Sequence, residues 1–287
     1  MSQQIHPTAQ IADSADLGEG VVIGPSAIVG PHVKIGARTR IGPLVVVDGH
    51  TTIGEDNVIV GQASLGAAPQ DLSYRDEPTV LEIGDRNTIR EFVSINRGTV
   101  KGGGVTRVGS DNLIMACCHV AHDCELEDNI VLSNSTGLAG HVKVGRNANL
   151  SGMCGIVHFV SIGEFAFLAG MTRLARDVPP YMIIEGHEGR VRGVNAVGLA
   201  RGGVEEADQR ALRGAYKRIF RGDEPQSAVL EKMRGEDHES GLVQRLVAAM
   251  SQMEGAVRGR VREGQRDDFM RVGRKLMREM SVPGFED

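Results

Sequence analysis

Branched aliphatic residues recur at every sixth position along most of this chain. They form three registered blocks of eleven, three and twelve positions, from Ile5 to Leu65, from Ile83 to Ile95 and from Val108 to Leu174. A period of six matches neither the 3.6 residues of an α-helix nor the alternation of an ordinary strand. It is typical of a parallel β-helix, a solenoid whose repeats bury a shared core by stacking. We therefore predict an all-β solenoid in which three hexads, or eighteen residues, make one triangular coil.

Two polar segments rich in Gly and Pro interrupt this period, at residues 66–82 and 96–107. We interpret both as loops inserted between coils of the β-helix. Long loops that leave a rigid scaffold are common carriers of function, and a neutral surface excursion is the alternative. We favour a functional role for both loops.

The six-residue period ends after Leu174, and from about residue 205 the apolar residues take a helical spacing. We predict a β-helix domain over residues 1–190 and a helical domain over residues 191–287. The helices would cover the open end of the solenoid, which otherwise exposes unpaired backbone. An Arg-rich tail begins at about residue 255.

The composition indicates a large aliphatic core. Hydrophobic residues make up 41% of the 287 positions, but aromatic residues only 3%, with no Trp. The 38 Gly residues can supply the unusual backbone angles that turns at every corner require. A net charge of -5 argues against bulk binding of nucleic acid. We find no basic or apolar leader and no apolar run of about 18 residues, so we expect neither a signal peptide nor a membrane span.

All four cysteines fall inside the repeat array. Cys118, Cys124 and Cys154 each lie two residues before a register aliphatic, and we interpret them as small core residues. The alternative is a zinc site, whose ligands would be Cys118, His119, His122 and Cys124. That spacing matches none of the usual zinc patterns. Free thiols fit a reducing compartment, so we expect a cytoplasmic protein.

The period also places chemically active residues side by side. His122, Gly140 and His158 follow one another at intervals of eighteen residues and form one column along an edge of the prism. Asp123 and His141 share this interval and form the adjacent column.

This grouping suits acyl transfer by general base catalysis. A histidine is the usual base for a hydroxyl, and a neighbouring carboxylate can fix its tautomer. A glycine one coil away offers a backbone N–H to an oxyanion. No nucleophilic Ser or Cys motif is needed, so we expect direct transfer without a covalent acyl-enzyme.

Eight short motifs follow one another in the chain. They are Ile28–Val33 (IVGPHV), Gln70–Leu72 (QDL), Asn96–Thr99 (NRGT), Val108–Met115 (VGSDNLIM), His119–Cys124 (HVAHDC), Leu138–His141 (LAGH), Asp177–Tyr181 (DVPPY) and Gly193–Asn195 (GVN). In this order and with both insertions, the sequence resembles the UDP-N-acetylglucosamine O-acyltransferase family, which catalyses the first step of lipid A synthesis. The resemblance extends to about residue 222 and implies a left-handed β-helix.

The resemblance implies a role for each matching residue. His122 would be the general base that takes the proton from the sugar 3-hydroxyl. Asp123 would orient this base, and the Gly140 amide would stabilise the oxyanion. Gln70 and Asp71 would bind the sugar of the nucleotide substrate.

Other matching residues would surround the substrates. His119 and His141 would line the sugar and diphosphate pocket, whereas Asn195 and Arg201 would reach the nucleotide. Gly170 matches the position that limits acyl length in the family. Glycine leaves room there, so we predict a 3-hydroxyacyl donor longer than about ten carbons.

Four positions depart from the family pattern. Asn96 stands where the family often has His, and His158 where it usually has Gln, so both would contact the substrate in a changed way. Val197 and Gly202 replace an acidic and a basic residue near the nucleotide. The acceptor sugar therefore stays open between N-acetylglucosamine and a 3-amino analogue.

The resemblance also implies partners. It predicts a homotrimer with active sites between subunits, an acyl donor carried on the phosphopantetheine of acyl carrier protein, and no metal or other cofactor. A basic surface could receive the acidic carrier protein, or it could be an ordinary solvated helix face. Its residues are Arg201, Arg210, Arg213, Lys217, Arg218 and Arg221.

Three alternatives remain. One is the hexapeptide N-acyltransferase of the same pathway, which carries an extra N-terminal uridine-binding domain for which a repeat starting at Ile5 leaves no room. Another is the trimeric zinc carbonic anhydrase type, which the four histidines favour but the insertions and C-terminal helices do not. The third is a scaffold without catalytic activity.

Overall fold

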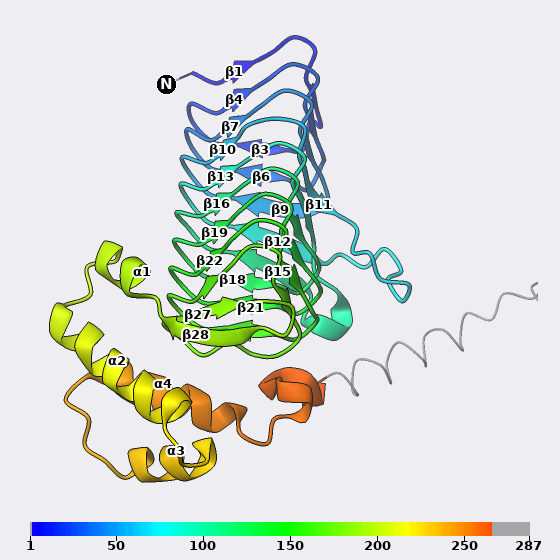
Figure 1. The fold of residues 1–287 in the computed structure, drawn as a ribbon. Helices are drawn as coiled ribbons and strands as arrows, with labels where there is room; N and C mark the ends of the chain where they lie inside the picture. The colour runs from blue at the N-terminus through cyan, green and yellow to red at the C-terminus, as the bar shows by residue number, and fades with distance from the viewer. Residues whose placement is uncertain (1, 266–287) are drawn as a thin grey trace, which may run out of the picture.

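The computed structural model describes residues 2–265 as a triangular prism of parallel strands followed by a group of helices (Figure 1). Up to β27 each strand pairs in parallel with the strand one coil away, as Gln4 pairs with Val22 and Ile5 with Ile23, and β28 (Arg190–Val194) closes the array as an antiparallel partner of β27 (Met182–Glu185). That offset of eighteen residues is the coil length expected from the six-residue period. The parallel β-helix predicted from the sequence is confirmed.

Three sheets form the faces of the prism. The first contains β1 (Gln4–Ile5), β4 (Val22–Ile23), β7 (Arg40–Ile41), β10 (Val58–Ile59), β13 (Thr88–Ile89), β16 (Leu113–Ile114), β19 (Val131–Leu132), β22 (Asn149–Leu150), β25 (Phe167–Leu168), β27 (Met182–Glu185) and β28 (Arg190–Val194). The second contains β2 (Gln10–Ile11), β5 (Ile28–Val29), β8 (Val46–Val47), β11 (Ser64–Ala67), β14 (Ser94–Asn96), β17 (His119–Val120), β20 (Gly137–Leu138), β23 (Gly155–Ile156) and β26 (Arg173–Leu174). The third contains β3 (Asp16–Leu17), β6 (Lys34–Ile35), β9 (His50–Ile53), β12 (Val80–Ile83), β15 (Val105–Val108), β18 (Glu125–Leu126), β21 (Lys143–Val144) and β24 (Ser161–Ile162).

The core is the stack of register aliphatics inside the prism. From Ile23 to Leu174 every residue of the register is at most 3% exposed. Ile5 is 45% exposed, because the first coil is covered on one side only. Cys118 and Cys124 are buried in this core, where burial raises the pKa of the two thiols to about 11 and about 12. The interpretation of these cysteines as core residues is confirmed.

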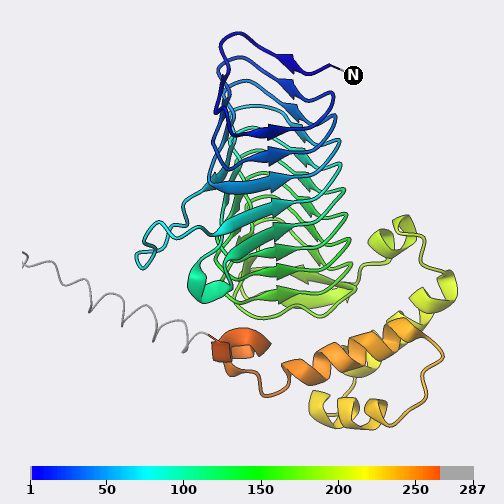
Figure 2. The ribbon, with the colours of Figure 1, turned by 180° about the vertical axis from the view of Figure 1, so that it is seen from behind.

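The two insertions leave the prism close together (Figures 1 and 2). The first follows β11, and the second contains a short 3-10 helix, η1 (Val100–Gly102). Arg97 joins them, because its guanidinium donates 2.7 Å hydrogen bonds to the carbonyl of Gly66 and to the hydroxyl of Tyr74. The two insertions therefore pack against each other on the outside of the prism.

The helices lie at the C-terminal end of the prism (Figure 2). They are α1 (Ala196–Arg201), α2 (Glu206–Arg221), α3 (Gln226–Arg234), α4 (Gly241–Met253), η2 (Val257–Gly259) and η3 (Val261–Gly264). In α4, Arg245 donates to Glu164 at 3.0 Å and to the hydroxyl of Tyr181 at 2.9 Å, which fastens the helices to the last coils. No helix among the described residues is both long and apolar enough to cross a membrane.

After α4 the chain returns to the prism. Arg260 donates to the carbonyl of Ala175 at 2.6 Å, and Arg262 donates to the carbonyl of His141 at 2.7 Å. Most of the Arg-rich tail expected from about residue 255 lies outside the described residues, at positions 266–287.

Candidate active site

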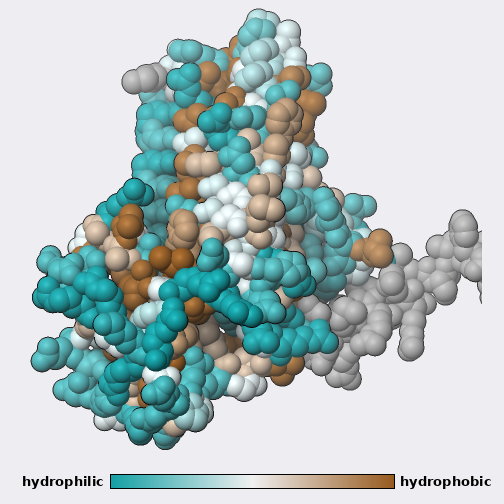
Figure 3. Space-filling view, in the orientation of Figure 1, coloured by the Kyte–Doolittle hydropathy of each residue, from teal (hydrophilic) through white to brown (hydrophobic). Residues whose placement is uncertain are grey.

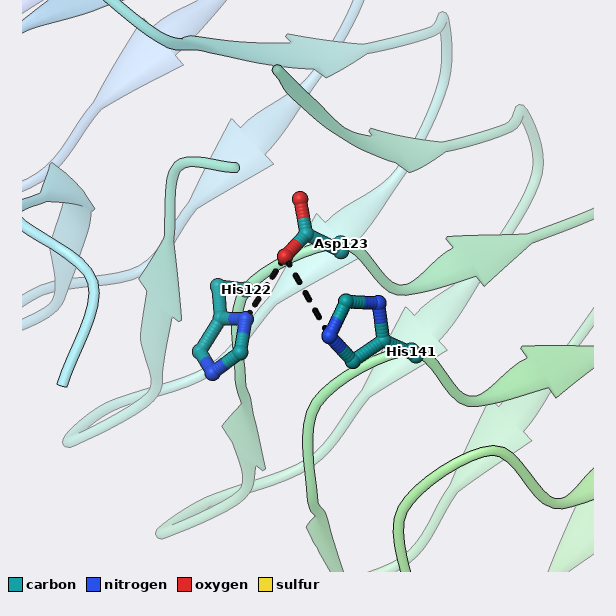
Figure 4. A group of neighbouring side chains, drawn as sticks. All are labelled: His122, Asp123 and His141. Atoms are coloured by element: carbon teal, nitrogen blue, oxygen red, sulfur yellow. Dashed lines mark hydrogen bonds and ion pairs between the residues drawn. The ribbon is translucent and has the colours of Figure 1, made fainter. Parts of the chain in front are cut away.

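Corner turns of two adjacent coils bring His122, Asp123 and His141 together (Figure 4). His122 and Asp123 lie between β17 and β18, and His141 precedes β21 one coil later. Asp123 and His141 both have positive φ, 61° and 65°, so the same left-handed turn presents both side chains at one corner. The Nδ1 atom of His122 lies 2.7 Å from Oδ2 of Asp123, and Nε2 of His141 lies 3.7 Å from the same oxygen.

The carboxylate of Asp123 is held from several sides. Its Oδ1 accepts the backbone N–H of Thr99 at 2.7 Å, and its Oδ2 accepts the hydroxyl of Thr99 at 2.6 Å. Asp123 is 3% exposed and His122 7%. Since the carboxylate accepts the Nδ1 proton of His122, the other ring nitrogen, Nε2, is left to act as a base.

Gly140 lies directly beside the imidazole ring. A Cβ atom at this position would stand 2.5 Å from Cε1 of His122, so any larger residue would displace the ring. Among the described residues, the N–H of Gly140 donates no hydrogen bond. A backbone donor is thereby available next to the base, as an oxyanion site requires.

Two further histidines surround the base in neutral form. Burial lowers the pKa of His141 to about 4, with His122, Arg262 and Lys101 adding to the effect and Asp123 opposing it. Its ring stacks on Phe159 at 4.4 Å. Burial also lowers the pKa of His119, whose Nδ1 lies 2.8 Å from the Ser94 hydroxyl.

The first insertion carries Asp71 up to the base. Oδ2 of Asp71 lies 3.9 Å from Nε2 of His122 and 2.5 Å from Nζ of Lys101. Burial alone would raise the pKa of Asp71, but hydrogen bonds from Lys101 and Ser73 outweigh it and hold the pKa at about 2. Asp71 is therefore a carboxylate under all physiological conditions.

Gln70, His119, His122, Gly140 and His158 all line one pocket of about 600 Å³, here called the base pocket. Asn96 lies beneath the first insertion, is 3% exposed and donates to the carbonyl of Ala68 at 3.0 Å. Its side-chain oxygen has no hydrogen-bond partner among the described residues. One pocket thus gathers the expected base, the expected oxyanion donor and three of the expected sugar ligands, Gln70, His119 and His158.

Comparison with known proteins decides the family. The model of a family described as "Udp N-acetylglucosamine O-acyltransferase; Domain 2" matches residues 177–261. The acyl-[acyl-carrier-protein]–UDP-N-acetylglucosamine O-acyltransferase of Verminephrobacter eiseniae is 48% identical over 217 residues, which are 76% of this chain and 83% of that protein. The chain belongs to the UDP-N-acetylglucosamine O-acyltransferase family.

Solved structures of this family share the fold. LpxA from Acinetobacter baumannii is 38% identical and superposes with a TM-score of 0.82 over 86% of this chain and 96% of that one. The UDP-N-acetylglucosamine acyltransferase of Francisella novicida is 33% identical, with a TM-score of 0.83 over 86% and 91% of the two chains. The protein is therefore an acyltransferase with the left-handed β-helix and C-terminal helices that the sequence motifs implied.

A second pocket of this acyltransferase lies at α1 and is here called the α1 pocket. Its volume is about 490 Å³, and Asn195 and Arg201 are among its lining residues. Hydrophobic side chains gather on this side of the prism where the helices meet it (Figure 3). Figure 1 places α1 across the prism from the two insertions, so one subunit does not bring these two residues to His122.

Gly170 also lies outside the base pocket. It occupies the turn after β25, where a Cβ atom would stand 3.5 Å from the carbonyl oxygen of Gly152. It lines neither the base pocket nor the α1 pocket. A single subunit thus separates the expected acyl, nucleotide and sugar positions.

His122, Asp123 and His141 of this acyltransferase offer three atoms that could serve as metal ligands. The atoms of this cluster lie within 4.8 Å of one another. Two ligands of a tetrahedral zinc ion stand about 3.3 Å apart. The 2.7 Å between Nδ1 of His122 and Oδ2 of Asp123 is instead a hydrogen-bond distance. Cys118, His119 and Cys124 do not belong to this cluster, so the four-ligand zinc site that included them is not formed among the described residues.

Sequence reasoning did not identify Thr99 or Lys101, although both contact carboxylates of the base pocket. The periodic offsets that located His122 and Gly140 end at an insertion. The one sequence signal that could have identified Lys101 as a functional residue is its position in an inserted loop for which a function was already expected.

Proposed function

We propose that this enzyme transfers a 3-hydroxyacyl group from acyl carrier protein to the 3-hydroxyl of UDP-N-acetylglucosamine, the first step of lipid A synthesis. Two observations at His122 carry the proposal. Asp123 is hydrogen-bonded to its Nδ1 atom, and Gly140, whose N–H donates no hydrogen bond among the described residues, lies directly beside its ring. This arrangement supports direct attack on a thioester, without a covalent enzyme intermediate.

In this mechanism Nε2 of His122 removes the proton from the sugar 3-hydroxyl. The oxygen forms a bond to the thioester carbonyl carbon, and the oxyanion that develops is stabilised by the Gly140 N–H. Asp123 keeps the Nδ1 proton in place and stabilises the imidazolium. The carbon–sulfur bond then breaks, and the imidazolium returns the proton to the thiolate of the phosphopantetheine.

The sugar would bind between the first insertion and the histidines. Asp71 and Gln70 would accept and donate hydrogen bonds at its hydroxyls, a role supported for Asp71 by its ionised state and its distance of 3.9 Å from Nε2 of the base. His119, His141 and His158 would contact the sugar and diphosphate, and Asn96 would support the same end from beneath the insertion. His119 and His141 would act as neutral hydrogen-bonding groups, because burial lowers the pKa of both.

The remaining contacts would come from a homotrimer. Asn195 and Arg201 would bind the nucleotide across a subunit boundary, and Gly170 would leave space for a long acyl chain. The separation of the base pocket from the α1 pocket in one subunit supports this arrangement, because a three-fold assembly can place unlike faces of neighbouring copies against each other.

Acyl carrier protein would dock near α2. The positive charge of this helix is partly offset, since Arg213 pairs with Glu206 and Arg218 with Glu236. The donor would bring its own phosphopantetheine, so the enzyme itself would need no cofactor. We place the reaction in the cytoplasm, which suits the reduced state of the four cysteines.

The test is transfer of a 3-hydroxyacyl group from its carrier protein to UDP-N-acetylglucosamine by wild type and His122→Ala. We expect turnover by the wild type and a loss in the variant of about 1,000-fold or more. Failure of a folded wild-type enzyme to turn over would reject the substrate. The 3-amino sugar nucleotide would then be assayed in the same way, which separates the wrong acceptor from the wrong enzyme class.

A further inference from the structure

The two insertions meet in an ion pair that is almost closed to solvent. Nζ of Lys101, in the second insertion, lies 2.5 Å from Oδ2 of Asp71 in the first. The two side chains are only 14% and 15% exposed. Nζ of Lys101 also donates to the hydroxyl of Ser73 at 3.0 Å. A pair so shielded interacts more strongly than an exposed surface pair.

This ion pair touches the base directly. The oxygen of Asp71 that binds Lys101 is the one that lies 3.9 Å from Nε2 of His122. The other oxygen accepts the backbone N–H of Ser73 at 2.8 Å and its hydroxyl at 2.6 Å. The carboxylate is thus fixed on both sides and directed at the nitrogen that must accept the sugar proton.

The charges around His122 explain why a cation is useful there. Asp123 lies at Nδ1 and Asp71 at Nε2, so the imidazole is placed between two carboxylates. His141 approaches edge-on, with ring centres 5.2 Å apart, and is kept neutral by burial. His119, on the preceding strand, is likewise shifted toward its neutral form by burial. Two carboxylates alone would favour the imidazolium, which cannot act as a base.

Lys101 offsets one of these two negative charges. The two contact distances place its ammonium within about 6.5 Å of Nε2 of His122, close enough for a substantial electrostatic effect in a shielded site. The ammonium is bound to Asp71 and not to the imidazole. Its effect on the base therefore has two parts, the direct electrostatic effect of the ammonium and the ordering of the Asp71 carboxylate beside the imidazole.

We propose that Lys101 is a positioning residue of this acyltransferase: it fixes Asp71 beside His122 and offsets the charge of Asp71, so that the base form of the imidazole is favoured at neutral pH. The proposal rests on the proposed function of His122 as the general base. It assigns the second insertion a task in the reaction, although no residue of η1 lines the base pocket.

The test compares the pH dependence of kcat/KM for UDP-N-acetylglucosamine in wild type, Lys101→Met and Lys101→Arg. In Lys101→Met we expect the acid limb of the profile to move up by about one pH unit, with activity approaching that of the wild type at high pH. Lys101→Arg should restore the wild-type profile. Lys143→Met is the matched control, because Lys143 forms a 2.6 Å pair with Glu125 outside the base pocket. It should leave the profile unchanged.

If Lys101 only held the two insertions together, its replacement would change the kinetics in a different way. Loss of activity by the same factor at every pH would overturn the proposal, as would a higher KM for the nucleotide without a change in the acid limb. Removal of both charges is a further check: in an Asp71→Asn background, Lys101→Met should move the acid limb less than it does with Asp71 present, because only the direct electrostatic effect of the ammonium remains. A shift of the full size there would show that Lys101 does not act through Asp71.

A second readout does not depend on turnover. Diethyl pyrocarbonate acylates unprotonated imidazole, and the part of the reaction lost in His122→Ala reports on His122 alone. Its pH midpoint should rise in Lys101→Met by the same amount as the acid limb. If the reactivity midpoint rises in Lys101→Met but the wild type never acylates the sugar nucleotide, the proposed substrate fails and the role of Lys101 stands. An unchanged reactivity midpoint rejects the role of Lys101.

Discussion

The base pocket and the α1 pocket belong to the same chain but differ in how complete they are. In the base pocket, adjacent coils and two insertions hold His122 and Asp123 in a hydrogen-bonded pair that is nearly closed to solvent. In the α1 pocket, the side chain of Asn195 is already engaged by the chain itself. It donates to the carbonyl of Phe165 at 2.8 Å and accepts the N–H of Gly198 at 3.0 Å, as a helix N-cap.

This difference suggests that the base pocket carries out proton transfer, whereas the α1 pocket contributes to binding of the substrate. Proton transfer needs groups fixed to within a fraction of an ångström, and one rigid chain can hold them that way. Recognition of a nucleotide tolerates a looser arrangement and can be completed by a second copy of the chain. We therefore expect changes in the base pocket to lower kcat and changes in the α1 pocket to raise KM.

The strongest contrast between the two pockets should come from comparing the kinetics of two single variants, Asp123→Asn and Arg201→Ala. Loss of the carboxylate removes the group that fixes the tautomer of His122, and kcat should fall about 100- to 1,000-fold with little change in KM. Arg201→Ala should act mainly on KM for the nucleotide. Steady-state kinetics at saturating acyl donor measure both, and a comparable fall in kcat for Arg201→Ala would erase the distinction.

Acid should act on the base pocket, because His141 is buried directly behind His122 and no histidine lines the α1 pocket. Its folded-state pKa of about 4 lies below the ordinary 6.5, so between these values the unfolded chain binds a proton that the folded chain does not. Stability from this group is present above pH 6.5 and is lost as the pH falls to 4. The loss should reach about 3 kcal/mol per chain.

Denaturant unfolding at a series of pH values measures this effect. His141→Gln is the matched variant, since it cannot ionise, and its stability should vary less over the same interval. Equal slopes in wild type and variant would mean that another group causes the acid sensitivity.

Gly170 tests whether the acyl site lies between subunits, since it lines neither pocket of a single chain. Gly170→Met should shorten the preferred acyl chain and lower kcat/KM for long donors about tenfold or more relative to short ones. Gly214→Ala, in the middle of α2 where a Cβ has open space, is the control. An unchanged ratio of long to short donors would place the end of the acyl chain elsewhere.

Mixed trimers give the smallest but most direct signal. At nucleotide concentrations well below KM, subunits carrying His122→Ala and subunits carrying Arg201→Ala are each expected to be impaired alone. If every site takes His122 from one copy and Arg201 from its neighbour, an equal mixture refolded together should regain about a quarter of wild-type activity. No recovery in verified mixed trimers would show that both residues serve the same site from one copy.

The sequence predicted the parts of the molecule that follow its period. The interval of eighteen residues implied that Gly140 would lie beside His122 and that Asp123 would lie beside His141, and the structure has both neighbours. The contacts of Asp71 and Lys101 could not be obtained in this way, because an insertion has no period and its path depends on packing such as that of Arg97 against Tyr74. Asn195 was found through resemblance alone, and its contact with the nucleotide stays a prediction.

The open first coil has a consequence for how such proteins change in length. Each strand in the early coils pairs with strands one coil before and one coil after it, and Ile5 in the first coil is 45% exposed. Removing or adding eighteen residues upstream of residue 66 would join equivalent positions and leave every later contact in place. The number of coils in front of the site is thus an adjustable quantity, available both to genetic duplication and to protein engineers who want a longer or shorter prism.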